Sequence, residues 1–213
     1  MIPVDLLLFD MDGTLIDTRQ DLTNSINYAR QQFKLSPLTL EDVLQSVGDG
    51  VKNLLKRTLP FSDEEKIAQA LSHFREHYKE HLLDFSKYYP GVPAVLNFFK
   101  NKKKVVVSNK PERFTQKIID GLGANDDFLL VIGGDTVGLK PGPGPVLYAL
   151  QQLDVQPEKA VIIGDSPSDM IAGRKAGTLT CAVTYGYRAR DLLEKYDPDF
   201  IIDSMIQLKE LFV

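Results

Sequence analysis

The sequence has only one cysteine among 213 residues, which excludes an intrachain disulfide framework and fits a reducing cytoplasm. It also has no apolar run approaching the roughly 18 residues needed to span a bilayer, so we expect no membrane segment. Its amino terminus shows neither a basic segment nor a small-residue cleavage site, and no signal peptide is expected. We therefore expect a cytoplasmic protein.

An excess of positive charge is missing as well. The 25 basic and 29 acidic residues give a formal net charge of -4, which provides no general field for binding nucleic acid. A single local cationic site for one phosphate is compatible with this balance. With 43% hydrophobic residues, the chain can bury one substantial core, with room for a smaller satellite domain.

Six short apolar runs, β-branched or rich in leucine, predict strands that are buried on both faces, as in a parallel sheet. They lie at residues 4–9, 104–107, 128–132, 160–163, 179–183 and 200–202. After residue 90 they alternate with segments of helical spacing at residues 92–100, 112–121, 145–153, 168–176, 189–196 and 204–211. This alternation predicts an α/β fold with a Rossmann-like wound parallel sheet.

One part of the chain departs from this alternation. Residues 19–88 show helical patterns and no strand-like run, after which Tyr89-Pro90-Gly91 breaks the chain. We predict an inserted all-α cap domain at residues 17–88. The α/β core domain is then formed by residues 1–16 together with residues 89–213.

Two carboxylates follow the first predicted strand directly. Asp10 and Asp12 are two residues apart, so on an extended chain they project to the same side. In a wound parallel sheet, ligands bind in the crevice beyond the carboxyl ends of the strands, where this pair would lie. Gly13 permits a sharp turn after them. The alternative interpretation is that Asp12-Gly13 is only a turn signal.

A second acidic group follows the predicted strand at residues 160–163. Asp165 would project into the same crevice, whereas Asp169 is also explained by a helix-capping box with Ser166, and the two interpretations are compatible. Carboxylates gathered in one crevice repel one another, so a cation must be present. Hard oxygen ligands without histidine or cysteine nearby favour Mg²⁺ over zinc.

Other strand ends carry groups that suit a phosphate. Lys140 follows the predicted strand at residues 128–132 and could supply a fixed cation, although an isolated lysine is usually a solvated surface charge. Ser108 and Asn109 end the predicted strand at residues 104–107 and offer a hydroxyl and an amide. Their alternative role is helix capping before Pro111.

Taken in order, these segments resemble the four sequence motifs of the haloacid dehalogenase superfamily. They are Asp10-Met11-Asp12-Gly13-Thr14, Ser108-Asn109, Lys140-Pro141 and Gly164-Asp165-Ser166-Pro167-Ser168-Asp169, so the match spans almost the whole chain. Further details are similar to the phosphoglycolate phosphatase branch: Asp17-Thr18, Val47-Gly48-Asp49-Gly50-Val51, Tyr89-Pro90-Gly91-Val92 and Ser108-Asn109-Lys110. That branch usually has threonine at the position of Ser108.

The resemblance implies a Mg²⁺-dependent phosphomonoester hydrolase that acts on a small phosphorylated metabolite such as 2-phosphoglycolate. Asp10 would be the nucleophile that forms an aspartyl-phosphate, and Asp12 the general acid and base. Asp10, the Asp12 carbonyl and Asp165 would bind Mg²⁺, while Asp169 supports these ligands or orients the catalytic Lys140. The residues that would bind phosphate or substrate are Gly13, Thr14, Gly48, Gly50, Ser108, Asn109 and Lys140.

Other functions stay open beside this one. A pyrophosphatase or a nucleoside monophosphatase would use the same motifs, and phosphoglucomutase activity is less favoured. An alternative of another class is a non-catalytic regulatory or binding protein with the same fold. We expect a small-molecule phosphate ester as the partner, no nucleic acid, no membrane, and a monomer or homodimer.

Two conspicuous features receive no functional role. His73, His77 and His81 recur four residues apart, which the border of an amphipathic helix explains better than a metal site. Cys181 lies in an apolar run without a neighbouring basic group, so we interpret it as core packing.

Overall fold

The computed structural model describes residues 1–48 and 50–213, and these residues divide into two compact units. The first, here called the α/β unit, consists of Met1–Asp17 and Tyr88–Val213. The second, called the helical unit, is Thr18–Lys87. The chain therefore leaves the α/β unit near its amino terminus and returns to it about seventy residues later, as a short insertion would.

Within the described part of the α/β unit, the strands form a six-stranded sheet in the order β5-β4-β1-β6-β7-β8, in which all neighbours are parallel. The prediction of a wound parallel sheet is confirmed, and each strand overlaps one of the six predicted runs. The strands are β1 (Leu6–Phe9), β4 (Lys103–Val107), β5 (Leu130–Ile132), β6 (Ala160–Gly164), β7 (Leu179–Val183) and β8 (Phe200–Ile202).

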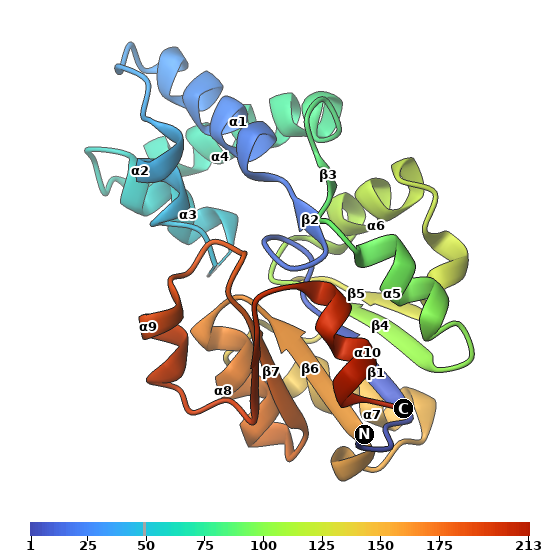
Figure 1. The fold of residues 1–213 in the computed structure, drawn as a ribbon. Helices are drawn as coiled ribbons and strands as arrows, with labels where there is room; N and C mark the ends of the chain where they lie inside the picture. Colours follow the sequence, from blue (N-terminus) through green and yellow to red (C-terminus); the bar gives the residue numbers. More distant parts are fainter. Residues whose placement is uncertain (49) are drawn as a thin grey trace. The chain divides into compact units, whose positions relative to one another are not determined.

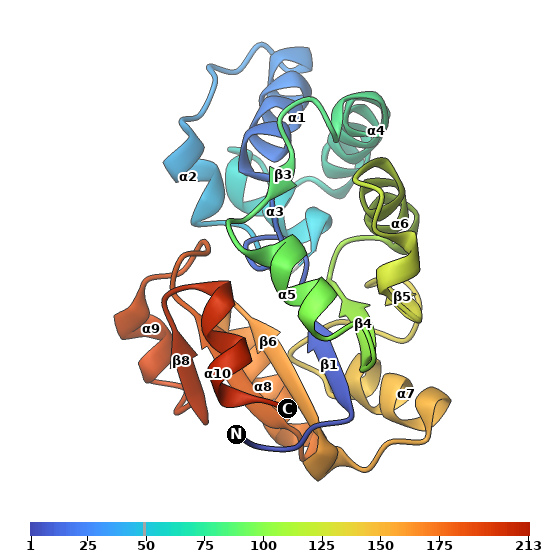
Figure 2. The same cartoon turned by 45° about the vertical axis from the view of Figure 1, so that its right-hand side comes forward.

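The central strand β1 is buried on both faces because helices cover both sides of the sheet. Figures 1 and 2 show α5 and α10 over one face and α7 and α8 over the other. Leu6 and Leu8 share a core cluster with side chains of α7 and α8, so by alternation Leu7 and Phe9 face the opposite layer. This arrangement explains why β1 reads as an unbroken apolar run.

The helices of the α/β unit largely match the helical segments read from the sequence. The helix expected at residues 204–211 is a 3₁₀ turn followed by a short α-helix, and α9 is shorter than the expected 189–196. The helices are α5 (Val92–Phe98), α6 (Glu112–Gly121), α7 (Gly144–Leu153), α8 (Pro167–Ala176), α9 (Arg190–Glu194) and α10 (Leu208–Leu211), with 3₁₀ turns η1 (Asn125–Asp127), η2 (Pro157–Lys159) and η3 (Met205–Gln207).

The helical unit contains α1 (Arg19–Gln32), α2 (Leu40–Leu44), α3 (Val51–Thr58) and α4 (Glu64–His81). Its core includes Ile26 of α1 and Phe74 and Tyr78 of α4, all at most 2% exposed. The buried Asp21 carboxylate accepts hydrogen bonds from the backbone N–H groups of Phe85 and Ser86, which ties the end of the unit to its first helix. No helix in the described part of the chain is long and apolar enough to cross a membrane.

One expectation for residues 19–88 is wrong in detail. A two-residue strand, β3 (Lys87–Tyr88), pairs with another two-residue strand, β2 (Ile16–Asp17), in a small separate sheet. Two residues are too few to show the period-2 alternation by which strands are recognised in a sequence. These short strands lie where the chain passes between the two units.

Candidate active site

The candidate site lies at the carboxyl ends of three adjacent strands. Asp10 follows β1, Ser108 follows β4, and Asp165 follows β6. β1 lies between β4 and β6, and because all three run parallel, their carboxyl ends meet at one edge of the sheet. The chain crosses from the β4 side to the β6 side of β1, so this edge contains a topological switch point, the usual ligand position in open α/β sheets.

Lys140 is buried at the centre of this edge, with a side chain only 2% exposed. Its Nζ donates to Asp10 Oδ1 at 2.8 Å, to Asp169 Oδ1 at 2.6 Å and to the Val107 carbonyl at 2.6 Å. The interpretation of Lys140 as a solvated surface charge is therefore wrong. One ammonium brings together carboxylates from positions 10 and 169.

The Asn109 side chain fixes the backbone at Lys140. Its Nδ2 donates to the Lys140 carbonyl and its Oδ1 accepts from the Lys140 N–H, both at 2.8 Å. The bond between Lys140 and Pro141 is cis. Asn109 therefore does not use its side chain to cap α6, which begins after Pro111 without a side-chain cap. The end of β4 and the loop carrying Lys140 are held together by this amide.

Asp169 has two structural tasks, as the sequence allowed. Its Oδ2 accepts from the Ser166 N–H at 3.1 Å and from Ser166 Oγ at 2.6 Å, which completes the capping box at the start of α8. Its Oδ1 accepts from Lys140 Nζ. Because the side chain is fully buried, the cap fixes the carboxylate that orients the lysine.

Asp165 lies in a close-packed pocket of backbone. Its Oδ2 accepts from the Tyr187 N–H at 2.6 Å. A Cβ at Gly13 would lie 2.2 Å from Asp165 Oδ2, and one at Gly186 would lie 2.3 Å from Asp165 Cβ. Gly13 also has φ +84°, which an L side chain rarely adopts. Glycine is required at both positions if Asp165 is to reach the site.

The carboxylates of the site carry more negative charge than Lys140 offsets. Burial raises the pKa of Asp10 to about 7, with Lys140 lowering it and Asp169 raising it. Burial, and then Asp10 and Asp169, raise the pKa of Asp165 well above its usual range. Burial alone would lower the pKa of Lys140, but its two carboxylate partners outweigh that effect and raise it. The site is therefore suited to a second cation.

The donor set fits a hard divalent cation. Carboxylate oxygens of Asp10, Asp165 and Asp169 lie within 4.8 Å of one another. Both Asp169 oxygens are engaged by Lys140 and Ser166, which leaves Asp10 and Asp165 better placed as ligands. The cluster, as far as the structure describes it, consists of carboxylates alone, which favours Mg²⁺ over softer metals.

Asp12 has a partner to which the sequence analysis assigned no role. Lys110 Nζ lies 2.7 Å from Asp12 Oδ1, and the two side chains are 6% and 14% exposed. In the sequence, Lys110 is marked only as the last residue of Ser108-Asn109-Lys110. Its position directly after a strand-end motif was the one available signal, because nothing local relates residue 110 to residue 12.

Two further residues assigned to phosphate binding are buried at the same edge. Ser108 Oγ accepts from the Lys110 N–H at 3.2 Å. Thr14 Oγ1 has no hydrogen-bond partner among the described residues, while the Thr14 carbonyl accepts from the Tyr185 hydroxyl at 2.9 Å. Phosphate binding by Ser108, Thr14, Gly13 and Asn109 stays a prediction.

Gly48 and Gly50 belong to the helical unit and precede α3 in the chain, and both have positive φ, 131° and 83°. Asp49, between them, lies outside the described residues. A role of Gly48 and Gly50 in substrate binding stays a prediction. So does the role of the helical unit as a cap over the site.

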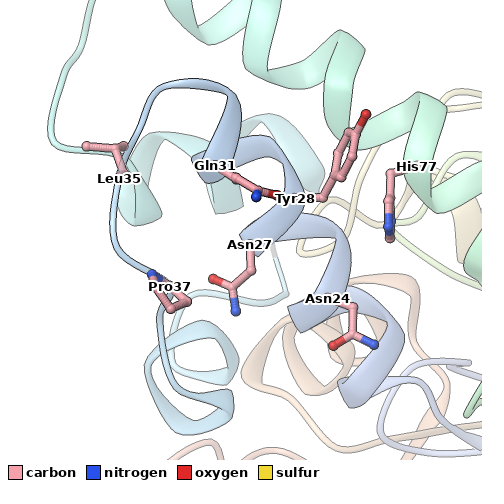
Figure 3. Close-up of a pocket in the computed structure, with 7 residues that line it drawn as sticks. All are labelled: Asn24, Asn27, Tyr28, Gln31, Leu35, Pro37 and His77. Atoms are coloured by element: carbon pink, nitrogen blue, oxygen red, sulfur yellow. The ribbon is translucent and has the colours of Figure 1, made fainter.

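The helical unit has a hollow of about 410 Å³ between α1 and α4. Figure 3 shows that its wall includes Asn24, Asn27, Tyr28 and Gln31 from α1 and His77 from α4. His77 Nδ1 lies 2.9 Å from Ser25 Oγ, and its ring stacks on Tyr28 with centroids 4.4 Å apart. No carboxylate or cation lines this hollow in the described residues, so it has none of the chemistry of the Asp10 site.

Comparison with known proteins identifies relatives that match nearly the whole chain. Residues 7–183 match the family described as haloacid dehalogenase-like hydrolase. A phosphoglycolate phosphatase from Aquifex aeolicus is 38% identical over 209 residues, covering 97% of this chain and 95% of the relative. One from Chromobacterium violaceum is 35% identical over 219 residues, with 98% and 96% coverage.

The fold is also similar to that of a solved structure. The crystal structure of a predicted phosphoglycolate phosphatase from Haemophilus somnus superposes with a TM-score of 0.94 at 28% identity, covering 99% of both chains.

Proposed function

Because this chain belongs to the haloacid dehalogenase-like hydrolases and is a phosphatase, we propose that it hydrolyses small phosphate monoesters, 2-phosphoglycolate foremost, with Asp10 as nucleophile and Mg²⁺ as cofactor. The observation that carries the proposal is the contact of buried Lys140 with both Asp10 and Asp169, close to Asp165. The choice of 2-phosphoglycolate follows the names of the relatives.

In the first step, a carboxylate oxygen of Asp10 attacks phosphorus while the bond from phosphorus to the leaving oxygen breaks. Asp12 gives its proton to that oxygen, so the alcohol leaves neutral and an aspartyl-phosphate remains. Lys140 already donates to Asp10 and can stabilise the charge on the transferred phosphoryl group. Ser108, at the end of the adjacent strand β4, supplies a hydroxyl for a phosphoryl oxygen.

In the second step, water attacks phosphorus as the bond to Asp10 breaks. The Asp12 carboxylate takes the proton of this water, which restores Asp12 for the next cycle. Phosphate leaves and Asp10 is again a free carboxylate. The same aspartate thus serves as acid and then as base, which requires it to stay in one place between the steps.

Mg²⁺ would be held by the side chains of Asp10 and Asp165 and by the Asp12 carbonyl. When bound, it supplies positive charge that offsets both the nucleophile and the phosphate. The raised pKa values of Asp10 and Asp165 support this assignment, since they reflect buried negative charge that one lysine leaves partly uncompensated.

Adding Mg²⁺ is expected to stabilise the protein against heat relative to the protein in EDTA. At a concentration 100 times Kd, binding to the folded state alone contributes about 2.7 kcal/mol, or roughly 5–10 °C in Tm for a chain of this size. The Asp165→Asn variant should lose most of this Mg²⁺-dependent shift in a thermal melt. The exposed Asp126→Asn serves as the control and should keep it. An unchanged shift in Asp165→Asn would contradict the ligand assignment.

The substrate is tested with purified protein, Mg²⁺ and a panel of phosphate compounds. We expect phosphate release with the highest kcat/KM for 2-phosphoglycolate, ahead of pyrophosphate, nucleoside monophosphates and sugar phosphates. Activity should vanish in EDTA and in Asp10→Asn. A higher kcat/KM for pyrophosphate or a nucleotide would identify that compound as the preferred substrate and leave the proposed mechanism unchanged. Release from no member of the panel would favour the regulatory alternative.

A further inference from the structure

Lys110 is a buried lysine beside the site that the proposed chemistry does not use. Its Nζ contacts Asp12 Oδ1 at 2.7 Å, and its side chain is 6% exposed. Removing an ammonium from water is strongly unfavourable unless its partner compensates, so a buried ion pair is weak evidence for a purely stabilising role. The pair joins residues 98 positions apart.

The backbone of Lys110 is fixed independently of this ion pair. Its N–H donates to Ser108 Oγ at 3.2 Å, and its carbonyl accepts from the Gly134 N–H at 2.9 Å. These bonds link the residue to the end of β4 and to the loop that follows β5. The Lys110 side chain therefore starts from a fixed backbone position. Its ammonium restricts the directions in which the Asp12 carboxyl group can point.

The two lysines of the site contact different aspartates at the end of β1. Lys140 contacts Asp10 and Asp169, two of the three carboxylates that lie within 4.8 Å of one another. Lys110 contacts Asp12, the residue assigned to proton transfer. Charge balance in the acidic cluster explains Lys140. Lys110 likewise offsets the charge of Asp12, which adds to the charge around Asp10, but it does so from an anchored backbone that also fixes where the Asp12 carboxyl group lies.

We propose that Lys110 is a positioning residue for Asp12, an inference that rests on the proposed function. The hydrogen bond from Lys110 Nζ to Asp12 Oδ1 holds the carboxyl group in both its protonated and its ionised form. In the protonated form, Asp12 gives its proton to the leaving oxygen as the bond to phosphorus breaks. This hydrogen bond also returns Asp12 to the same place for accepting the proton of water as the bond to Asp10 breaks. Lys110 keeps its own protons in both steps and transfers none. Its contribution is orientation, which decides the rate of a proton transfer over hydrogen-bond distances.

The test compares leaving groups in the Lys110→Met variant, which keeps most of the length of the unbranched side chain and removes the charge. With the best alkyl phosphate of the panel, the leaving oxygen needs a proton, and kcat/KM should fall at least roughly 10-fold. With 4-nitrophenyl phosphate, whose leaving group departs as a stable anion, the fall should stay below about 3-fold. Lys110→Arg, which keeps a cationic donor, should recover part of the loss on the alkyl phosphate.

A double-mutant cycle with Asp12→Asn provides the second readout. Lys110→Met should reduce single-turnover hydrolysis of the alkyl phosphate less than about 2-fold when Asp12 is already replaced. The double variant leaves neither partner charged and unpaired, so it remains informative if Lys110→Met alone folds poorly. Circular dichroism and thermal melts verify the fold of each variant.

Equal losses for both leaving groups, or the same loss with and without Asp12, would overturn the inference. The first result would mean that Lys110 binds the phosphate itself, and the second that it acts independently of Asp12. Failure of the proposed function is recognised separately, because wild-type protein would then release no phosphate from any ester. Active wild-type protein with an inactive Asp10→Asn variant and no leaving-group effect would disprove the role of Lys110 alone.

Discussion

Asp10→Asn is expected to fold normally and to lose at least roughly 10³-fold in turnover, as when other enzymes lose their nucleophile. The amide has nearly the shape of the carboxylate but lacks the negative charge that attacks phosphorus. It can still accept a hydrogen bond from Lys140 through its carbonyl oxygen, so the 2.8 Å contact has a substitute. The measurement is kcat for phosphate release with Mg²⁺, together with a thermal melt.

Stability and activity should move in different directions in this variant. Burial raises the pKa of Asp10, which means that its ionised form is disfavoured where it lies. Removing the charge should leave the melting temperature in EDTA unchanged or higher, while activity disappears. Asp126→Asn, at an exposed position, is the matched control and should change neither property. Wild-type turnover by Asp10→Asn would remove Asp10 from the role of nucleophile.

The strand-end residues could be predicted because their signal is local. The unbroken apolar run at β1 identifies a strand covered on both faces, and Asp10 follows it directly. The same holds for Asp165 after β6 and Ser108 after β4. Because neighbouring parallel strands end at the same edge of the sheet, identifying the strands is enough to predict that these residues lie in one region.

The contacts that complete the site could not be derived from local sequence patterns, since they depend on how loops return in three dimensions, although the family resemblance indicated a contact between Asp169 and Lys140. Lys140 lies on a loop between β5 and α7, and two hydrogen bonds with the Asn109 side chain, one donated and one accepted by Asn109, hold its backbone in place. Likewise, the approach of Lys110 to Asp12 depends on the turn after β4. A lysine in a loop is most often solvated, so Lys140 taken by itself favours a surface charge, and only its resemblance to a family motif predicts its place in the site.

The capping box at α8 shows that two roles predicted for the same residue can be compatible. Asp169 uses one oxygen for Ser166 and the other for Lys140. A carboxylate accepts several hydrogen bonds at once, so local capping and a long-range ion pair can share it.

Lys140→Met is expected to destabilise the metal-free protein by roughly 3–5 kcal/mol, the usual range when one partner of a buried charge pair is removed. Lys140 is 3% exposed and donates to two carboxylates, one fully buried at Asp169 and one only 11% exposed at Asp10. Its loss leaves Asp10 and Asp169 facing each other, with Asp165 nearby. The free energy of unfolding, measured by urea titration in EDTA, provides the test. Lys52→Met, which removes an exposed partner of Glu64, is the control and should remain close to wild type.

The double variant Lys140→Met with Asp10→Asn separates charge repulsion from lost packing. If repulsion dominates, neutralising Asp10 should restore part of the stability, so the effects of the two substitutions will not add. Mg²⁺ should restore part of it as well, since a cation bound between Asp10 and Asp165 offsets the same charges. Additive effects, or a Lys140→Met variant as stable as wild type in EDTA, would contradict the view that this lysine neutralises the site. In that case Asp10 and the neighbouring carboxylates would have to be protonated in the metal-free protein. A protonated Asp10 could not act as the nucleophile until a metal ion displaced its proton.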